Sequence, residues 1–191
     1  MATVTIVLRV MSLLALAGPM LLGVRRHRAP SEARARRRAG DRAPVVANFA
    51  TFGLFFPSLL LFAGSSEGST ALWLAASGSL FAVAGAALVL RSRAELGPAW
   101  SFAPMADQGT GLVTTGPYRH VRHPIYLALA LLAIGEALAF GSGPALMIVL
   151  FGVVPTFAWR ASAEEKLLGR TFGERYSVYR RRTKMIIPYL L

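Results

Sequence analysis

Apolar residues gather in five long runs that are separated by polar or basic stretches. The runs cover residues 4–24, 45–64, 71–90, 124–140 and 144–159. A helix needs about 20 mostly apolar residues to cross a bilayer, so the pattern predicts an all-α integral membrane bundle of about five transmembrane helices. The last two runs are short for complete spans, and we expect them to be tilted or partly buried in protein. Only Gly141, Ser142 and Gly143 separate them, which predicts a tight helical hairpin.

The positive charges favour the same five-helix arrangement. Of the 21 Lys and Arg residues, 20 fall in three stretches, residues 25–42, 91–122 and 160–184. With five crossings these stretches share one side of the membrane, and the two connections on the other side, 65–70 and 141–143, carry no Lys or Arg. By the positive-inside rule we expect a multi-pass protein with its N-terminus outside and its C-terminus cytoplasmic. A signal peptide is disfavoured, because no basic residue precedes the first run and Arg9 interrupts it.

Composition narrows the classes of function. The chain of 191 residues is 54% hydrophobic and 16% charged, which departs from soluble domains in the direction of membrane proteins. The absence of cysteine excludes disulfide scaffolds, thiol nucleophiles and iron–sulfur clusters, and three histidines leave little for a metal site. The basic stretch 25–42 contains no aromatic residue to stack on bases, so it indicates contact with anionic membrane lipids and no nucleic acid.

Candidate chemistry begins in the connection before the fourth run. Residues 91–123 are rich in Gly and Pro, and loops of this length are usually functional or mobile. The triplet Gly109-Thr110-Gly111 resembles part of a nucleotide-binding turn but lacks the βαβ context of one. Residues 116–126, GPYRHVRHPIY, then place two His, two Arg and two Tyr at the entrance of a membrane helix. Both an interfacial anchor and a binding site explain this cluster.

A pair of acids follows the fifth run in a chain that has few acids. Arg160 and Glu164 are four residues apart, which predicts a salt bridge on one helical face near the membrane boundary. Glu164 and Glu165 together are suited to hold hydroxyls or a cationic group. The tail then spaces Leu168, Phe172, Tyr176 and Tyr179 by four, four and three residues. This stripe predicts a C-terminal amphipathic helix that lies on the membrane surface and covers the site.

Polar residues inside the apolar runs have structural explanations. Glu136 lies near the outer end of the fourth run, so we expect an interfacial position for it. Arg9 is expected to snorkel outward or to pair within the bundle. Asn48 and Pro57 in the second run are expected to serve packing or a kink rather than catalysis.

The ordered motifs resemble the isoprenylcysteine carboxyl methyltransferase family, which is related to the phospholipid N-methyltransferases. They are GPY and RHPIY, then Glu164-Glu165, then FGE-x-Y-x-x-Y and a terminal Pro188. The resemblance is strong over residues 91–188, and before that only the helices correspond. It implies a membrane-bound transferase that uses S-adenosyl-L-methionine and releases S-adenosyl-L-homocysteine. It also implies one membrane domain, with three helices in residues 1–90 and a cofactor-binding core in 91–191.

Carried over by position, the resemblance implies a cofactor site at Thr110, Gly111, Leu112, Val113, Tyr118, His123, Pro124, Ile125, Tyr126 and Glu164. Arg160 matches the position that the family assigns to the substrate carboxylate, and it is the candidate catalytic residue. The family often has Gly where this chain has Ala128, a change that affects either helix packing or the cofactor pocket. A polar cofactor with a sulfonium cation suits carboxylate and aromatic groups.

The acceptor stays open at this point. An ionised carboxylate or thiolate needs no general base, and Arg160 favours such an anion. A protonated amine needs a base, for which Glu164, Glu165 or His120 are candidates. A prenylated protein, a phospholipid amine, an isoprenoid acid and a small thiol are all compatible acceptors, and the oligomeric state is unknown. The alternatives of other classes are a non-catalytic membrane protein, a transporter, and a sterol reductase, for which 191 residues leave little room.

Overall fold

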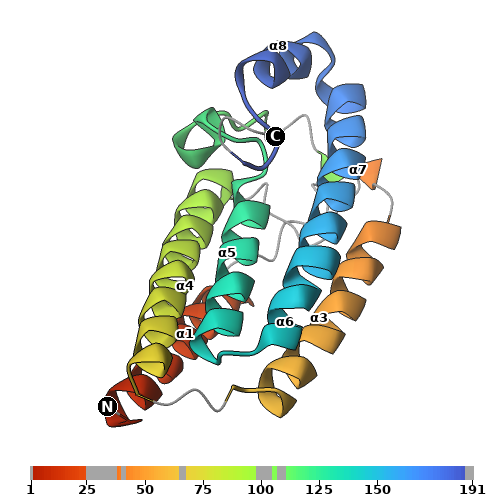
Figure 1. The fold of residues 1–191 in the computed structure, drawn as a ribbon. Coiled ribbons are helices and arrows are strands. Elements are labelled where there is room, and N and C mark those ends of the chain that lie inside the picture. Colours follow the sequence, from red (N-terminus) through yellow and green to blue (C-terminus); the bar gives the residue numbers. More distant parts are fainter. Residues whose placement is uncertain are drawn as a thin grey trace.

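A computed structural model describes residues 2–24, 38–39, 42–64, 68–97, 105–106 and 111–187. The longer helices are α1 (Ala2–Val24), α3 (Ala43–Leu61), α4 (Gly68–Leu96), α5 (Pro124–Ala139) and α7 (Val154–Phe172). The shorter elements are β1 (Arg38–Ala39), β2 (Met105–Ala106), η2 (Gly116–Arg119), α6 (Gly143–Ile148), the π-helical η3 (Val149–Val153) and α8 (Glu174–Arg182). Helices therefore lie at all five predicted positions, in an elongated bundle whose termini are at opposite ends (Figure 1).

Three of the helices are long and apolar enough to cross a membrane: α3, α4 and the continuous helix from Gly143 to Phe172. The apolar helix α5 has only 16 residues. Large apolar side chains face outward from the bundle, including Phe49, Leu60, Trp73 and Phe151, each about 70% exposed. An apolar surface of this extent is typical of contact with lipid, and the protein is a membrane protein.

The fifth helix is longer than its apolar run. It consists of α6, η3 and α7, and it reaches Phe172 rather than residue 159. The apolar run ends at Trp159 because the next turns are polar. The helix continues beyond it, because the loop before α5 supplies partners for those polar side chains. The helix stops at Gly173, whose φ of +56° is a conformation that glycine adopts without steric cost. The prediction of one tail helix from Leu168 to Tyr179 is therefore wrong, because α8 is a separate helix.

The helices α4 and α5 pack at backbone contact distance. Buried residues on α4 alternate at spacings of four and three: Ala71, Ala75, Gly78, Ala82, Gly85, Val89 and Ser92. This heptad spacing with small residues is typical of close helix packing in membranes. A Cβ atom on Gly78 would lie 2.4 Å from the backbone nitrogen of Ala139, and one on Gly85 would lie 2.7 Å from the Ala128 carbonyl oxygen. Ala128 therefore packs against α4, where Gly85 provides the space.

The outer end of α5 carries a polar contact with α1. The Ser12 hydroxyl donates to the Glu136 carboxylate (3.0 Å). The Arg9 Nε donates to the Ala139 carbonyl (2.9 Å), and the Arg9 guanidinium lies over the Phe140 ring. A cation at the C-terminal end of a helix is favourable. Arg9 thus pairs within the bundle, one of its two predicted positions. The Glu136 side chain is completely buried, and Ser12 supplies the partner that hydrocarbon does not offer. Its interfacial position stays a prediction.

The turn between α5 and α6 is the predicted tight hairpin. The Ser142 backbone nitrogen donates to the Ala137 carbonyl (2.9 Å). The Ser142 hydroxyl accepts from the backbone nitrogen of Ala145 and donates to the Ser58 carbonyl of α3. From this turn α5 and α7 run toward the other end of the molecule (Figure 1). Between them and α3 lies a core that includes Phe55, Leu59, Val149, Val153, Phe157 and Tyr126.

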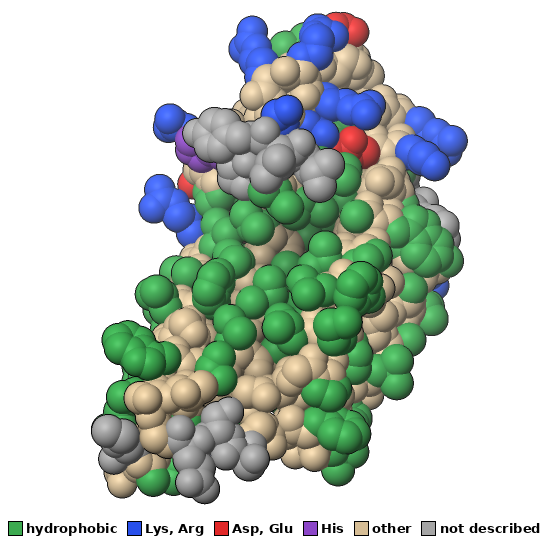
Figure 2. Space-filling model, viewed as in Figure 1, with side chains coloured by type: hydrophobic (Ala, Val, Ile, Leu, Met, Phe, Trp, Pro, Cys, Tyr) green, Lys and Arg blue, Asp and Glu red, His purple; other side chains and the backbone are tan. Residues whose placement is uncertain are grey.

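The described parts of the three basic stretches meet at one end of the bundle, here called the basic end. Strand β1 pairs with β2 in antiparallel register, so the connection after α1 touches the connection after α4. A β-bridge between Val121 and Lys184 joins the second stretch to the third. Figure 2 shows Lys and Arg side chains gathered at this end, above a largely apolar surface. The shared end agrees with the predicted topology, while its cytoplasmic orientation stays a prediction.

The contact between α4 and α5 predicts an effect on stability. We expect Gly78→Ala to lower the free energy of unfolding by about 1–3 kcal/mol, because the added methyl group has only backbone atoms to displace. The matched control is Gly53→Ala on exposed α3, where a Cβ atom meets nothing within 4 Å and alanine favours the helix. Thermal unfolding in detergent measures both variants. Equal stability of the two would contradict the packing described here.

Candidate cofactor and acceptor site

The loop before α5 is held in place by α4. Gly116 has a φ of +56°, and a Cβ atom there would meet the Glu95 carboxylate at 2.5 Å. The Thr115 hydroxyl donates to the other Glu95 oxygen (2.8 Å). The loop then forms η2 and enters α5 at Pro124, which is buried at the first helical position, as predicted. Glu95 thereby fixes the approach of His123 and Tyr126 to α7.

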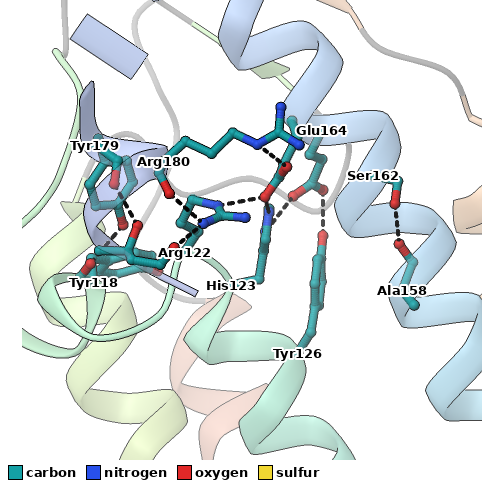
Figure 3. Close-up of polar contacts among 11 residues, drawn as sticks. Tyr118, Arg122, His123, Tyr126, Ala158, Ser162, Glu164, Tyr179 and Arg180 are labelled. Atoms are coloured by element: carbon teal, nitrogen blue, oxygen red, sulfur yellow. Dashed lines mark hydrogen bonds and ion pairs between the residues drawn. The ribbon is translucent and has the colours of Figure 1, made fainter. Parts of the chain in front are cut away.

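Glu164 on α7 is the meeting point of three side chains. The Tyr126 hydroxyl donates to Glu164 Oε1, and the Arg160 Nε lies 3.3 Å from the same oxygen, which confirms the predicted i,i+4 pair. The His123 Nδ1 lies 3.6 Å from the second oxygen. Figure 3 shows His123 and Tyr126 rising from α5 toward Glu164. The Glu164 side chain keeps 20% of its surface exposed, more than His123 or Arg160 beside it.

Aromatic rings line the side of this carboxylate that faces the bundle. The Tyr126 ring stacks on His123 (5.4 Å between centroids, 9° between planes) and on Phe157 (5.2 Å and 11°). The Arg160 guanidinium lies 5.2 Å from the Tyr126 centroid, within the range of a cation–π contact. The site therefore combines a carboxylate, a guanidinium and π faces, a set that suits both a cation and an anionic group.

Glu165 points to a different set of partners. Its carboxylate receives the Arg122 Nε at 2.6 Å and the Arg180 Nε at 3.5 Å, and the His123 Nε2 lies 3.7 Å away. Both Arg122 and Glu165 are less than 10% exposed. Arg122 also donates to the carbonyls of Arg180 and Thr183. The pair thus ties the loop before α5 to α7 and to the C-terminal segment (Figure 3).

The C-terminal segment closes over the loop before α5. The backbone nitrogens of Arg122 and His123 donate to the carbonyls of Lys184 (2.8 Å) and Met185 (2.9 Å). The Tyr179 hydroxyl donates to the Tyr118 carbonyl (2.7 Å). Tyr176 and Tyr179 are buried and so face protein instead of lipid. The prediction that the tail covers the loop therefore has a geometric basis. The prediction that Tyr176 and Tyr179 belong to a stripe facing the membrane surface is wrong.

The two carboxylates set the protonation of the groups around them. Burial alone would lower the pKa of His123, but the hydrogen bonds and charges of Glu164 and Glu165 outweigh it and raise the pKa above its ordinary value. His123 is therefore more readily protonated between the two acids. Burial raises the pKa of Tyr118, and Tyr179, Glu164 and Glu95 raise it further, so its phenol stays neutral.

The structure brings together only part of the predicted site. His123, Tyr126, Arg160 and Glu164 form one cluster, and buried Tyr118 is near enough for Glu164 to affect its pKa. Ile125 is half-buried beside them. Gly111 is exposed, Leu112 and Val113 are half-buried in the loop, and their role at a cofactor stays a prediction. Thr110 lies outside the described residues.

The three candidate bases differ in their surroundings. Glu164 accepts from Tyr126 and lies beside Arg160. His120 is exposed, and among the described residues no ion pair of its side chain with Glu164 or Glu165 is present. Glu165 is held between two arginines, which favour its ionised form but also occupy it.

The sequence interpretation missed two residues that shape the site. Phe157 is seven residues before Glu164 and three before Arg160, a spacing that places all three on one helical face. That spacing is a signal that could have identified it. Glu95 gave no such signal, because its contact with Thr115 and Gly116 depends on how the loop folds back on α4.

These geometric features belong to a helical membrane protein with a polar site at one end. A family model described as phospholipid methyltransferase matches residues 73–175. The match covers more than half of the chain, and the chain belongs to the phospholipid methyltransferase family. It begins within α4 and ends in α8, so it includes Glu95, the loop before α5 and both carboxylates.

Two curated proteins match a shorter part of the chain. The protein-S-isoprenylcysteine O-methyltransferase of Schizosaccharomyces pombe is 32% identical over 79 residues, 41% of this chain and 34% of that protein. The protein of the same name from Saccharomyces cerevisiae is 35% identical over 79 residues, 41% of this chain and 33% of that protein. The match spans about one third of the length of these relatives. The predicted relation to the isoprenylcysteine carboxyl methyltransferase family is confirmed.

The buried ion pair predicts a large effect on the tail. We expect Arg122→Ala to lower the free energy of unfolding by about 3–5 kcal/mol, because it leaves the Glu165 charge buried without its closest partner. The control is Arg181→Ala, which removes an exposed pair with Glu174 (3.2 Å) and should cost less than about 1 kcal/mol. Thermal unfolding and the rate of proteolysis within α8 report the two effects. Equal losses in both variants would contradict a special role for Arg122.

Proposed function

We propose that this protein is an integral membrane methyltransferase that uses S-adenosyl-L-methionine to methylate a lipophilic acceptor, most similar to the isoprenylcysteine carboxyl O-methyltransferases. The observation that carries the proposal is the Glu164 cluster, in which a partly exposed Glu side chain, a stack of aromatic rings and Arg160 meet at the basic end. The basic end is proposed to face the cytoplasm, where positive loops are retained.

The described residues suit the proposed cofactor. Bound S-adenosyl-L-methionine supplies an electrophilic methyl group on a sulfonium cation. Glu164 would accept hydrogen bonds from hydroxyl or amino groups of the cofactor, its charge would attract the sulfonium, and Tyr126 and Tyr118 would line the pocket. His123, Pro124 and Ile125 would form the wall at the start of α5. Thr110, Gly111, Leu112 and Val113 would contribute backbone from the loop.

The geometry favours an anionic acceptor. Arg160 carries a forked set of donors that binds a carboxylate through two parallel hydrogen bonds. An ionised acceptor needs no base, so alignment and exclusion of water supply most of the rate. A protonated amine would need a free base, whereas Glu165 is engaged by Arg122 and Arg180 and Glu164 by Tyr126 and Arg160, which leaves the exposed His120. The phospholipid N-methyltransferase alternative rests on the family description.

A direct assay tests the activity and separates the acceptors. Purified protein is incubated with methyl-labelled S-adenosyl-L-methionine and either a prenylated cysteine carboxylate or a phosphatidylethanolamine vesicle. We expect a base-labile methyl ester with the first acceptor. Label in the phospholipid amine instead would establish the alternative. If neither product forms and S-adenosyl-L-homocysteine does not bind, the chain is a non-catalytic membrane protein.

Three further assignments are part of the proposal. Residues 91–191 are proposed as the cofactor-binding core and residues 1–90 as its three-helix support, with a boundary that falls inside α4. Membrane lipids and a lipophilic or lipidated substrate are the proposed partners. The substrate would enter laterally between the helices, with only its reactive head near Arg160.

Removing the charge of Glu164 tests the cofactor site. We expect Glu164→Gln to weaken the binding of S-adenosyl-L-homocysteine about tenfold or more, because hydrogen bonds to a charged group are the stronger ones. Calorimetric titration measures the Kd, with exposed Glu174→Gln as the matched control. A folded Glu164→Gln protein with wild-type affinity would remove Glu164 from the cofactor site.

Removing Arg160 separates acceptor binding from cofactor binding. We expect Arg160→Ala to lower activity by about 100-fold, from loss of a charge-assisted bond in a partly buried site. Cofactor affinity should change several-fold at most, through the released Glu164. Exposed Arg170→Ala on the same helix is the control. Equal losses of activity and cofactor affinity would argue against a role in acceptor binding.

A further inference from the structure

The fifth helix contains a π-helical turn one turn before the proposed site. Residues Val149–Val153 form η3 between α6 and α7. Single π turns inside α-helices are rare and are frequently found at functional sites. Pro155 follows two residues later and has no N–H to donate, so a carbonyl in the preceding turn lacks its helical donor. The helix therefore departs from α geometry over the segment that leads to Phe157, Arg160 and Glu164.

The π turn affects which face of the helix reaches the site. Buried residues recur at every fourth position: Ala145, Val149, Val153, Phe157, Ala161 and Glu165. In an α-helix of 3.6 residues per turn, such a row drifts about 40° around the axis at each step. A π turn holds more residues, and so it removes part of this drift. It thereby keeps this row of side chains closer to one face of the helix.

A hydrogen bond from α3 holds this turn. The Asn48 Nδ2 donates to the Thr156 hydroxyl at 2.6 Å, and Asn48 is only 4% exposed. The Thr156 hydroxyl in turn lies 2.9 Å from the Gly152 carbonyl and 3.0 Å from the Val153 carbonyl. It therefore supplies a donor to the last carbonyls of η3. In hydrocarbon these groups have no water as an alternative partner, so the bond between the helices specifies the local geometry.

The next residue after Thr156 is the first residue of the proposed site. Phe157 stacks on Tyr126, and its ring also lies 6.0 Å from Phe52 of α3. Arg160 and Glu164 follow at helical spacings of three and seven. We propose that Asn48 and Thr156 are positioning residues, which hold the π turn and thereby set the rotation of α7 that places Arg160 and Glu164 opposite Tyr126. The expected effect on cofactor binding rests on the proposed function, whereas the expected geometry of α7 does not.

Cofactor binding provides the first test. Thr156→Val removes the hydroxyl at nearly constant volume, and we expect the Kd for S-adenosyl-L-homocysteine to rise about tenfold with unchanged stoichiometry. Thr156→Ser should restore the wild-type Kd. The control is Ser77→Ala on α4, whose hydroxyl contacts only the Trp73 and Leu74 carbonyls of its own helix among the bonds described, and it should leave the Kd unchanged. A fall in stoichiometry at constant Kd, or an equal effect of Ser77→Ala, would overturn the proposal.

The partnership of the two residues has its own test. If Asn48 acts through Thr156, Asn48→Ala should raise the Kd as Thr156→Val does, and the double variant should lose no more than either single variant. Multiplied losses in the double variant would show independent roles and would overturn the proposal.

A distance measurement tests the geometry without reference to activity. The chain has no cysteine, so Ser162→Cys on α7 and Arg91→Cys on α4, both exposed, can carry a pair of spin labels. We expect Thr156→Val to shift or broaden the distance distribution, while Ser77→Ala leaves it unchanged. If the wild-type protein does not bind S-adenosyl-L-homocysteine, the proposed function fails and this measurement alone decides the inference. An unchanged distribution in Thr156→Val would overturn it.

Discussion

The backbone contact between α4 and α5 is the constraint on which the other elements depend. The helix α5 has 16 residues, which is short for an independent span, and α4 holds it along a row of glycine and alanine residues. Lipid offers no hydrophobic gain for helix association, so such contacts depend on close van der Waals packing. A fixed α5 then presents His123 and Tyr126 at one end and Glu136 at the other. The site and the docking of α1 both follow from the position of this helix.

Three hydrogen bonds of polar side chains join neighbouring helices of the bundle. Glu136 accepts from Ser12, Arg9 donates to the end of α5, and Asn48 donates to Thr156. In hydrocarbon these groups have no water as an alternative partner, so the bonds specify which helices meet. They act in different places: α1 is held on α5 at the end far from the site, and α3 is held on α7 below the site.

Hydropathy and charge were sufficient for the helices but not for their ends or contacts. The apolar runs located five helices. The basic stretches predicted one shared end, where the described parts of all three stretches meet. The fifth helix was underestimated because a hydropathy run ends where the polar residues begin, whereas Glu165 is buried by Arg122 from 43 residues away. The partner of Glu136 was missed for a similar reason, since Ser12 is 124 residues away. Such partners follow from tertiary packing and leave no local pattern.

Within the candidate site, the residues predicted correctly are those joined by short-range geometry. The pair of Arg160 and Glu164 follows from helical spacing, and Pro124 at the start of α5 follows from its missing N–H. The stack of Tyr126 on Phe157 could have been sought from the spacing of Phe157 to Glu164. The π turn could not, because η3 has an ordinary apolar sequence and its geometry depends on Asn48 of another helix.

The two adjacent glutamates show how one short segment serves two purposes. Consecutive residues of an α-helix point about 100° apart, which follows from 3.6 residues per turn. Glu164 accordingly faces Tyr126 and Arg160, while Glu165 faces Arg122 and the C-terminal segment. His123 lies between them and contacts both carboxylates. A displacement of the C-terminal segment would therefore alter the charge around Glu165 first and then, through His123, the carboxylate at the proposed cofactor site. The tail that covers the loop is in this way electrostatically connected to the residues beneath it.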